Sequence, residues 1–314
     1  MKIATKESVE YIYGDMPKRP LHLSTKTDSC DKTFAAGKAE LRKEAMYIEI
    51  EDKLLSLPFV SVVPRKGGVI PSIIMISESG EIPNKHLPAE EIIDRGYAIY
   101  LVKASDVCEL SDKKAGLYSK LVSSRRKRNT PGKIAVMAWA LERLGEHVCS
   151  LEYTEKSRVA LAGHGIFARV ALLAGERSNA THIIANGATA LPIPFTKDIP
   201  RSGLTVKNLP QLYSPAFVEE PVYDELKELL RSTKTKKVLL GSAEEGDGAS
   251  IEYESSIIGE IMPTLMEKTA KRKAPIKALW QDESCSYHVR SGVDYFSRDD
   301  WKIYLDYIDN NPAK

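Results

Sequence analysis

The sequence predicts an α/β protein with a mostly parallel central sheet and helices on both of its faces. Short apolar runs suited to buried strands alternate along the chain with segments of helical period. The chain has 314 residues, 43% of them hydrophobic and 28% charged, which is enough for one large core. We therefore expect a single domain over residues 46–314, preceded by a lead-in at 1–45 that wraps the core.

Apolar runs bounded by polar or turn residues mark the expected buried strands, at 59–63, 72–76, 97–102, 159–162, 182–185, 238–240 and 278–280. A partly alternating stretch at 45–51 indicates that the lead-in joins the sheet through an edge strand pair. The stretch at about 190–222 is rich in proline and predicts a loop excursion over the carboxyl edge of the sheet. Ligands bind at that edge in such folds.

Three helices have recognisable ends. The helix at 87–95 is followed by Gly96, a C′ glycine that turns the chain into the next strand. A second helix is expected to begin with Thr130 as N-cap and Pro131 at its first position, and its apolar face should pack on the sheet. The last runs from about Arg298 to Ile308 and stops at an Asn-Asn-Pro breaker.

Composition argues against several classes of partner. The formal charge is only +2, and the short basic runs at 125–128 and 271–273 are interpreted as solvated surface, so no nucleic acid is expected. No stretch reaches the roughly 18 apolar residues of a membrane span, and the N-terminus does not resemble a signal peptide. A cytoplasmic protein that does not bind membranes is therefore expected.

The cysteines also favour this location, because Cys30, Cys108, Cys149 and Cys285 lie far apart and form no C-x-x-C pair. Reduced thiols fit best. No H-x-x-H, D-x-D or comparable cluster indicates a metal. Gly163-His-Gly165 resembles the start of a G-x-G-x-x-G dinucleotide motif, but Ala168 stands in place of the third glycine. The acidic residue that such a site needs further along the chain is also not evident, so no cofactor is expected.

The segment 157–169 reads as a buried strand, a sharp turn and a helix, which is the context of a G-x-S-x-G nucleophile elbow. Here the motif is Gly163-His-Gly-Ile-Phe167. Gly165 therefore takes the position of the nucleophilic serine, and Phe167 takes that of the last glycine. A glycine has no hydroxyl with which to attack an ester.

Several segments together resemble bacterial α/β-hydrolases related to glucuronoyl esterases and often labelled acetyl xylan esterases. The similar segments are Phe34-Ala-Ala-Gly-Lys38, Ile92-Ile-Asp-Arg-Gly-Tyr-Ala98, Gly132-Lys-Ile-Ala-Val-Met-Ala-Trp-Ala-Leu-Glu-Arg143, Ser242-Ala-Glu-Glu245 and Tyr287-His-Val-Arg-Ser-Gly292 followed by Asp300-Trp301. They extend over nearly the whole chain. The resemblance implies an α/β-hydrolase fold and, in the family, a serine triad that cleaves carbohydrate esters.

Carried over residue by residue, the resemblance implies that every member of the triad is absent. The family's serine matches Gly165, its histidine matches Asp294, and its acid matches Gly246 or Ser250. The base removes the proton of the serine and the acid orients the base, so these losses together predict no serine-triad catalysis. The family's elbow arginine also matches an apolar residue, Ile166.

Eight residues are expected around the remaining pocket: His164, Ile166, Phe167, Arg169, Glu244, Glu245, Asp247 and His288. For several of these residues a structural role is favoured over a catalytic one. His164 and His288 fit packed structural histidines better than catalytic bases. The two glutamates are most simply loop carboxylates, although one could hold a sugar hydroxyl. Cys285 is expected to be inert packing. Two serines could supply a displaced hydroxyl, Ser242 and Ser250.

The sequence thus predicts a catalytically degenerate carbohydrate-esterase-like α/β-hydrolase, a pseudoenzyme that binds a small molecule, a sugar or a protein partner. Two alternatives stay open: an active carboxylic or carbohydrate ester hydrolase with a displaced nucleophile, and a structural subunit of an oligomer. Such a subunit would pair with itself as a homo-oligomer or with an active relative. An enzyme would show turnover, a binder ligand-dependent stability, and a subunit only mass-dependent assembly.

Overall fold

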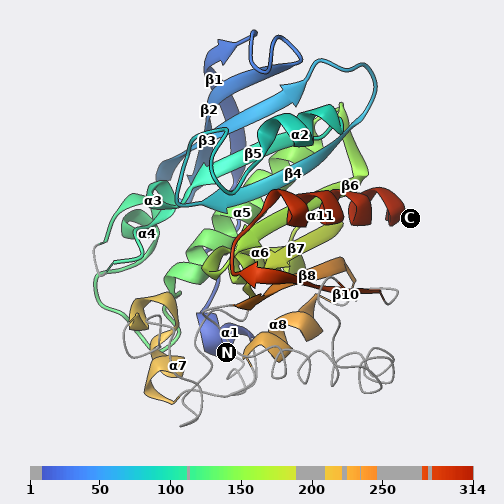
Figure 1. Ribbon diagram of the computed structural model, residues 1–314. Coiled ribbons are helices and arrows are strands. Elements are labelled where there is room, and N and C mark those ends of the chain that lie inside the picture. The colour runs from blue at the N-terminus through green and yellow to red at the C-terminus, as the bar shows by residue number, and fades with distance from the viewer. Residues whose placement is uncertain are drawn as a thin grey trace.

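The computed structural model describes residues 9–111, 114–188, 209–220, 225–233, 235–245, 278–281 and 285–313. Its elements follow the chain from α1 to α11 (Figure 1). The strands are β1 (His22–Asp31), β2 (Ala39–Ile50), β3 (Lys53–Pro64), β4 (Ile70–Ser77), β5 (Ala98–Lys103), β6 (Thr154–His164), β7 (His182–Asn186), β8 (Lys237–Glu245), β9 (Ala278–Gln281) and β10 (Cys285–Val293). The helices are α1 (Val9–Tyr13), α2 (Ala89–Asp94), α3 (Ala104–Val107), α4 (Gly116–Leu121), α5 (Lys133–Ser150), α6 (Ile166–Arg177), η2 (Pro210–Leu212), α7 (Pro215–Glu219), α8 (Glu225–Ser232) and α11 (Arg298–Asn310).

The described strands form one sheet in the order β1-β2-β3-β5-β4-β6-β7-β8-β10-β9. The central run from β5 to β10 is parallel throughout. Antiparallel pairs occur only towards the two edges of this sheet, at β1-β2-β3-β5 and at β10-β9. The predicted α/β fold with a mostly parallel sheet is confirmed.

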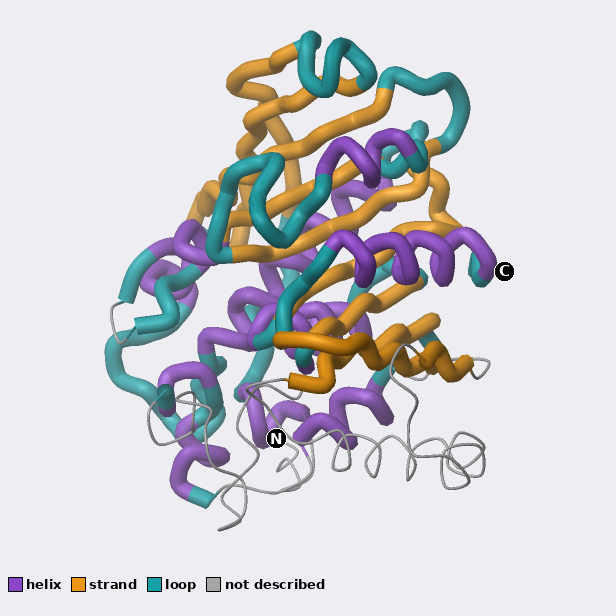
Figure 2. Tube along the Cα trace, in the orientation of Figure 1, coloured by secondary structure: helices purple, strands orange, loops and turns teal. Residues whose placement is uncertain are grey.

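Alternate residues of the parallel strands enter two separate cores, one on each face of the sheet. Ile74 of β4 and Leu161 of β6 belong to the core that contains α5 and α6. The adjacent Met75 and Ala162 belong to the core of α2 and α11. In Figures 1 and 2, α11 crosses one face of the sheet while α5 and α6 lie behind it. The prediction of helices on both faces is thereby confirmed, and burial on both faces explains why these strands read as continuous apolar runs.

The N-terminal part is more regular than the sequence indicated. β1 and β2 form an antiparallel pair, and β2 runs through the position 45/46 where a domain boundary was expected. The run at 59–63 belongs to β3, which is antiparallel to β5 and not a parallel strand. β1 and β2 form the edge strand pair that was expected, but the bounds of β1 were not predicted because it is exposed along nearly its whole length and has no apolar period. The division of the chain into domains stays a prediction.

Two other expectations were wrong in detail. The N-cap of α5 is Gly132 and not Thr130, because the Thr130 hydroxyl accepts a hydrogen bond from the Lys127 backbone N–H at 2.6 Å and so closes the preceding turn. β10 was not predicted as a strand, since its polar Ser286 and His288 break the apolar pattern although both are buried. The helices before Gly96 and after Ser297 lie close to where their end signals placed them.

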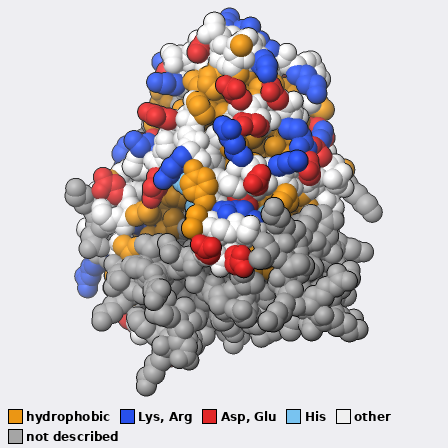
Figure 3. Space-filling model, in the orientation of Figure 1, with side chains coloured by type: hydrophobic (Ala, Val, Ile, Leu, Met, Phe, Trp, Pro, Cys, Tyr) orange, Lys and Arg blue, Asp and Glu red, His pale blue; other side chains and the backbone are white. Residues whose placement is uncertain are grey.

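The proline-rich stretch at 190–222 falls mostly outside the described residues. Its described part, 209–220, contains η2 and α7. No helix in the described part of the chain is long and apolar enough to cross a membrane. On the face drawn in Figure 3, acidic and basic side chains are intermixed over the described surface.

Candidate functional site

The site is built around the turn between β6 and α6. β6 ends at His164, α6 begins at Ile166, and Gly165 between them has φ 59° and ψ −120°. The Gly165 N–H donates a hydrogen bond to the Asn186 carbonyl of the neighbouring β7 at 2.9 Å. A Cβ on Gly163 would lie 2.1 Å from the Phe167 carbonyl oxygen, so glycine is needed for the helix to fold back this closely on the strand. The predicted strand, sharp turn and helix are all present.

Space is open where the nucleophile of such an elbow would project. Among the described atoms, none lies within 4 Å of the position that a Cβ on Gly165 would take. A cavity of about 330 Å³ opens there, and it is bordered by the elbow, the carboxyl end of β4 and the loop that follows β4. Its walls are largely apolar and comprise Met75, Ile76, Leu110, Ile166, Phe167 and Phe296. The charged lining residues, Glu78 and Lys85, are exposed and therefore lie at the mouth.

His164 lines this cavity and is held from several sides. Its Nδ1 is 2.7 Å from the Asn186 Oδ1, and the Asn186 Nδ2 donates to the Tyr304 hydroxyl at 2.6 Å. The imidazole also stacks with the rings of His86, at a centroid distance of 5.5 Å, and Phe296, at 6.1 Å. Ring stacking and the hydrogen bond at the Nδ1 edge therefore fix the orientation of the imidazole.

The second imidazole of the site belongs to His86. Burial is the main cause that lowers the pKa of His86 to about 4, and the neighbouring His164 and Lys85 act in the same direction. The ring also packs against Tyr295 at a centroid distance of 4.8 Å, and the His86 carbonyl accepts a hydrogen bond from the Trp301 Nε1 at 2.8 Å. His86 is therefore an uncharged, positioned part of the cavity wall at neutral pH.

Asp294, the residue matched to the catalytic histidine, lies beside His164. Its Oδ1 is 4.0 Å from the His164 Nδ1, and its backbone N–H donates to the Glu245 carbonyl at 3.1 Å. Both carboxylate oxygens come within 3.1 Å of the position that a Cβ on Gly187 would occupy. The structure therefore brings His164, the neighbour of Gly165 in the chain, together with Asp294.

Three other predicted pocket residues do not line the cavity, contrary to expectation. Arg169 is only 1% exposed and is buried within α6. Glu244 and Glu245 are exposed where β8 leaves the buried part of the sheet. Residues at these positions were expected at the pocket from motif alignment alone, which gives position along the chain and not the direction of the side chain.

His288 was also expected at the pocket and is instead a buried structural residue. Its Nε2 is 3.5 Å from the Asp300 Oδ1, and its ring contacts that of Tyr304 edge to face at a centroid distance of 6.2 Å. Burial alone would raise the pKa of Asp300, but hydrogen bonding by His288 and Ser297 and the charge of Arg290 hold that pKa below its usual value. The packed-histidine interpretation fits this residue.

The remaining candidates contribute nothing to the cavity walls. Gly246, Asp247 and Ser250 lie outside the described residues. Ser242 is buried within β8. Cys285 is buried at the first residue of β10, opposite Val238 at the amino end of β8, whereas the elbow lies at the carboxyl end of the parallel strands. Within the described ranges, no group of three or more His, Cys, Asp or Glu side chains is placed to hold a metal ion.

Three residues of the site were missed by sequence reasoning: His86, Asn186 and Phe296. Asn186 directly follows the predicted strand at 182–185, and the loop with His86 follows the predicted strand at 72–76. The carboxyl ends of parallel strands meet at one edge, so position after a strand was an available signal for both. Phe296 comes from the loop before α11, and no comparable signal marks it.

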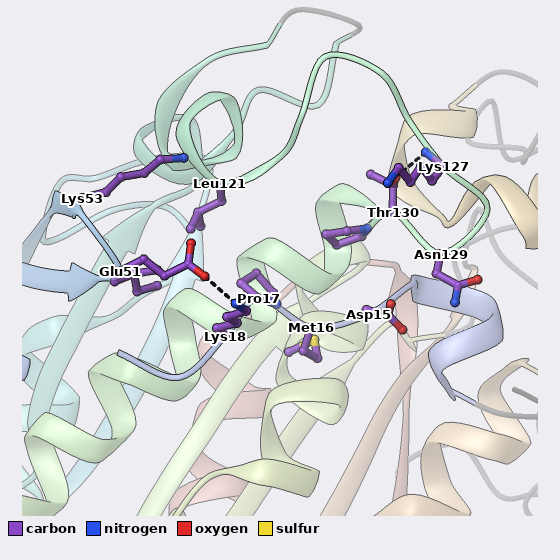
Figure 4. Close-up of a pocket in the computed structure, with 12 residues that line it drawn as sticks. Asp15, Met16, Pro17, Lys18, Glu51, Lys53, Leu121, Lys127, Asn129 and Thr130 are labelled. Atoms are coloured by element: carbon purple, nitrogen blue, oxygen red, sulfur yellow. Dashed lines mark hydrogen bonds and ion pairs between the residues drawn. The ribbon is translucent and has the colours of Figure 1, made fainter. Parts of the chain in front are cut away.

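A second cavity, of about 370 Å³, lies away from the elbow between the segment after α1, the β2–β3 turn and the loop before α5 (Figure 4). Its charged side chains are largely engaged with one another or with backbone. Lys18 forms an ion pair with Glu51, and the Lys53 Nζ donates to the Lys120 carbonyl at 3.0 Å. These exposed, already paired groups do not define a ligand.

The sheet and the strand–turn–helix segment around Gly165 are those of an α/β-hydrolase fold. Among solved structures, the chain is similar to a glucuronoyl esterase from Solibacter usitatus, with a TM-score of 0.78 and 18% identity over 98% of this chain and 90% of that chain. It is also similar to a promiscuous CE15 esterase from a marine bacterial metagenome, with a TM-score of 0.74 and 16% identity over 98% and 89% of the two chains. The catalytic domain of a glucuronoyl esterase from Hypocrea jecorina matches with a TM-score of 0.65 and 13% identity over 96% and 80%.

The fold is therefore that of a glucuronoyl esterase-like α/β-hydrolase, as the sequence resemblance implied. No protein-family model matches the chain, and no curated protein does.

Proposed function

We propose that this protein is a catalytically degenerate α/β-hydrolase that binds a small organic molecule in the cavity over Gly165. The observation that carries the proposal is the open space above this glycine, in a cavity with mostly apolar walls. A volume of about 330 Å³ is in the range of small-molecule sites. The missing side chain leaves room for a ligand where the fold otherwise holds a nucleophile.

The same residues argue against serine-triad turnover. Gly165 carries no hydroxyl, and Asp294 offers a carboxylate where an imidazole base would act. Loss of triad members in a serine protease lowers kcat by up to about 10⁶-fold. Binding without hydrolysis is the function that this combination supports best.

Hydrolysis by a displaced nucleophile is the second candidate, and one observation favours it. The His164 imidazole lies beside both Asn186 and Asp294, which is the kind of polar support that an activating base requires. Against it stands the burial of Ser242 and Cys285 within strands. The other serine considered, Ser250, lies outside the described residues.

Two measurements on the purified protein test the proposal. Hydrolysis of 4-nitrophenyl acetate and of methyl glucuronate is compared with a heat-inactivated sample, and no turnover above that control is expected. Thermal unfolding is then followed with 4-methylphenol, and a ligand at ten times its Kd should stabilise by about 1.4 kcal/mol. Turnover that heating abolishes would overturn the binding proposal in favour of a displaced nucleophile.

A matched pair of variants locates the binding. Ser79 lines the cavity and is half-buried, so Ser79→Trp should block the cavity and abolish the rise in Tm. Ser123 is exposed on a loop away from the elbow, and Ser123→Trp should leave the ligand response unchanged. An equal response in both variants would place the ligand elsewhere. Assembly that rises with protein concentration, with no ligand response, would favour the structural-subunit alternative.

A further inference from the structure

The tautomer of His164 is set by a short chain of hydrogen bonds behind the cavity. The Asn186 Nδ2 donates to the Tyr304 hydroxyl, so the Oδ1 of the same amide faces the His164 Nδ1 at 2.7 Å. An amide oxygen only accepts, and the His164 Nδ1 must therefore carry the proton. In the neutral ring, the Nε2 is then a hydrogen-bond acceptor.

The Nε2 edge of this ring is the edge available to a ligand. Asn186 and Asp294 occupy the Nδ1 side, and a Cβ on Gly187 would come within 3.4 Å of the His164 Cε1. The side chain is nevertheless 25% exposed and belongs to the cavity wall. Among the described residues, the hydrogen bonding of this ring is through the Nδ1, and none is found at the Nε2. The wall of the cavity therefore carries an acceptor that the described residues do not use.

The cavity walls beside this acceptor carry little charge, because the Asp294 carboxylate lies on the Nδ1 side of the ring. His86, stacked on His164, is uncharged at neutral pH because its pKa is lowered to about 4. Ile166 and Phe167 border the same space with apolar side chains. Glu78 and Lys85, which carry opposite charges, are exposed at the mouth. A ligand that fits these walls is uncharged and apolar over most of its surface.

We propose that the cavity selects a neutral, largely apolar ligand with one hydroxyl group, which donates its hydrogen bond to the His164 Nε2. His164 is then the specificity-determining residue, and Asn186 is a positioning residue that acts through it. An alcohol or phenol satisfies both the acceptor and the apolar walls. A carboxylate would place a second acceptor against the Nε2 and lose its water shell among apolar side chains. The inference rests on the binding function proposed above.

Three probes of one shape test it: 4-methylphenol, 4-methylanisole and 4-methylbenzoate. The phenol donates a hydrogen bond, the methyl ether does not, and the benzoate is an anion. Calorimetric titration at pH 8 should give about tenfold tighter binding of the phenol than of the ether, since the ether leaves the acceptor without a partner. His164→Phe keeps a ring for stacking, and in this variant the phenol and the ether should bind equally.

The outcomes separate the two proposals. Equal binding of the phenol and the ether by the wild-type protein overturns the role of His164 while leaving a binding cavity. Tightest binding of the benzoate overturns the ligand class. Failure of all three probes to bind at 10 mM overturns both proposals.

A second experiment tests the tautomer of His164 directly on the wild-type protein, without any ligand. Imidazole ¹H–¹⁵N correlation spectra report which ring nitrogen carries the proton, and His164 should show the Nδ1–H tautomer. His182 is an internal comparison, because its Nε2 is 2.8 Å from the Asn311 carbonyl oxygen and must carry the proton instead. An Nε2–H tautomer at His164 would overturn the inference.

Discussion

Two glycines of the elbow are required for different physical reasons. Gly163 is required by distance, because a Cβ there would lie 2.1 Å from the Phe167 carbonyl oxygen. Gly165 is favoured by its backbone, since φ 59° is a conformation that other residues adopt only with strain. Glycine in this turn thus avoids the strain that a serine would carry there.

Alanine at the two positions should separate these reasons. Gly163→Ala forces the strand and α6 apart and should cost about 3 kcal/mol of unfolding free energy. Gly165→Ala meets open space and should cost only about 1–2 kcal/mol, the strain of a left-handed backbone. Urea denaturation of the two variants measures the difference. A larger loss at Gly165 than at Gly163 would contradict this account of the turn.

His182 should make the fold sensitive to acid. It is fully buried, and burial lowers its pKa from 6.5 to about 4. Because the unfolded chain takes up this proton first, stability should fall as the pH drops from about 6.5 towards 4, by about 3 kcal/mol for this one group. Urea denaturation from pH 7 to pH 4 measures the slope. His182→Gln should reduce it by up to about 1.4 kcal/mol per pH unit, and an unchanged slope would exclude His182 as a cause.

Among the elements, α11 is fixed at both ends to the rest of the fold. At its start, Ser297 and Asp300 form a capping box, and the buried Asp300 carboxylate also accepts from the Arg290 Nε at 2.9 Å. At its end, Asp309 accepts from the Tyr97 hydroxyl and the Arg158 Nη1, both at 2.6 Å. The helix therefore depends on polar groups as well as on its apolar face.

Substitutions in the capping box should have unequal effects. Ser297→Ala removes one cap and should cost about 1 kcal/mol. Asp300→Asn removes the buried charge that faces Arg290 and His288, and should cost about 3 kcal/mol or more. Thermal unfolding of the two variants checks the order. Equal losses would mean that Asp300 acts only as a cap.

The sequence predicted elements well where local signals agree with the tertiary structure. α11 has a polar N-cap, helical apolar period and a breaker after it, and its bounds are close to those expected. α5 begins later than predicted because the Thr130 hydroxyl is hydrogen-bonded within the preceding turn. Glycine is needed at 132 because a Cβ there would lie 2.1 Å from the Leu212 carbonyl oxygen, far along the chain. Contacts of that kind have no signature in the local sequence.

At the scale of the whole molecule, β1 forms one edge of the ten-stranded sheet and, among the described strands, pairs only with β2. Unpaired edges invite pairing with another chain, and proteins commonly protect them with charges and bulges. Both devices are present here. Lys26 and Asp28 lie on β1 within 3.8 Å of each other, and the register of β1 against β2 shifts between Thr27 and Ser29. We expect this edge to resist self-association.

Removing the charges should reverse that behaviour. The double substitution Lys26→Val and Asp28→Val leaves a hydrophobic edge and should produce dimers or larger species as the concentration rises. Lys43→Val is a matched control. Lys43 is also exposed, but it lies on β2, which is hydrogen-bonded to β1 on one side and to β3 on the other. Multi-angle light scattering over a concentration series measures the effect. Association of the wild-type chain would show that β1 does not protect the edge, or that another surface pairs.

Only the residues of the site that lie on the elbow segment could be predicted from the sequence. His164, Gly165, Ile166 and Phe167 are consecutive, so a single motif placed them together. His86 and Phe296 reach the same cavity from loops about 80 residues before and 130 residues after the elbow, and the sheet topology brings them there. Motif alignment put His288 in the pocket wrongly, because it cannot tell which face of a strand a side chain takes.

The relaxed backbone at Gly165 also bears on the history of this chain. A serine placed there would carry the left-handed strain at once and, under the proposed function, its hydroxyl would have no base to activate it. That substitution would then lower stability and bring no activity in return. Selection acting on single mutations would remove it, so a glycine at this elbow is easier to gain than to lose.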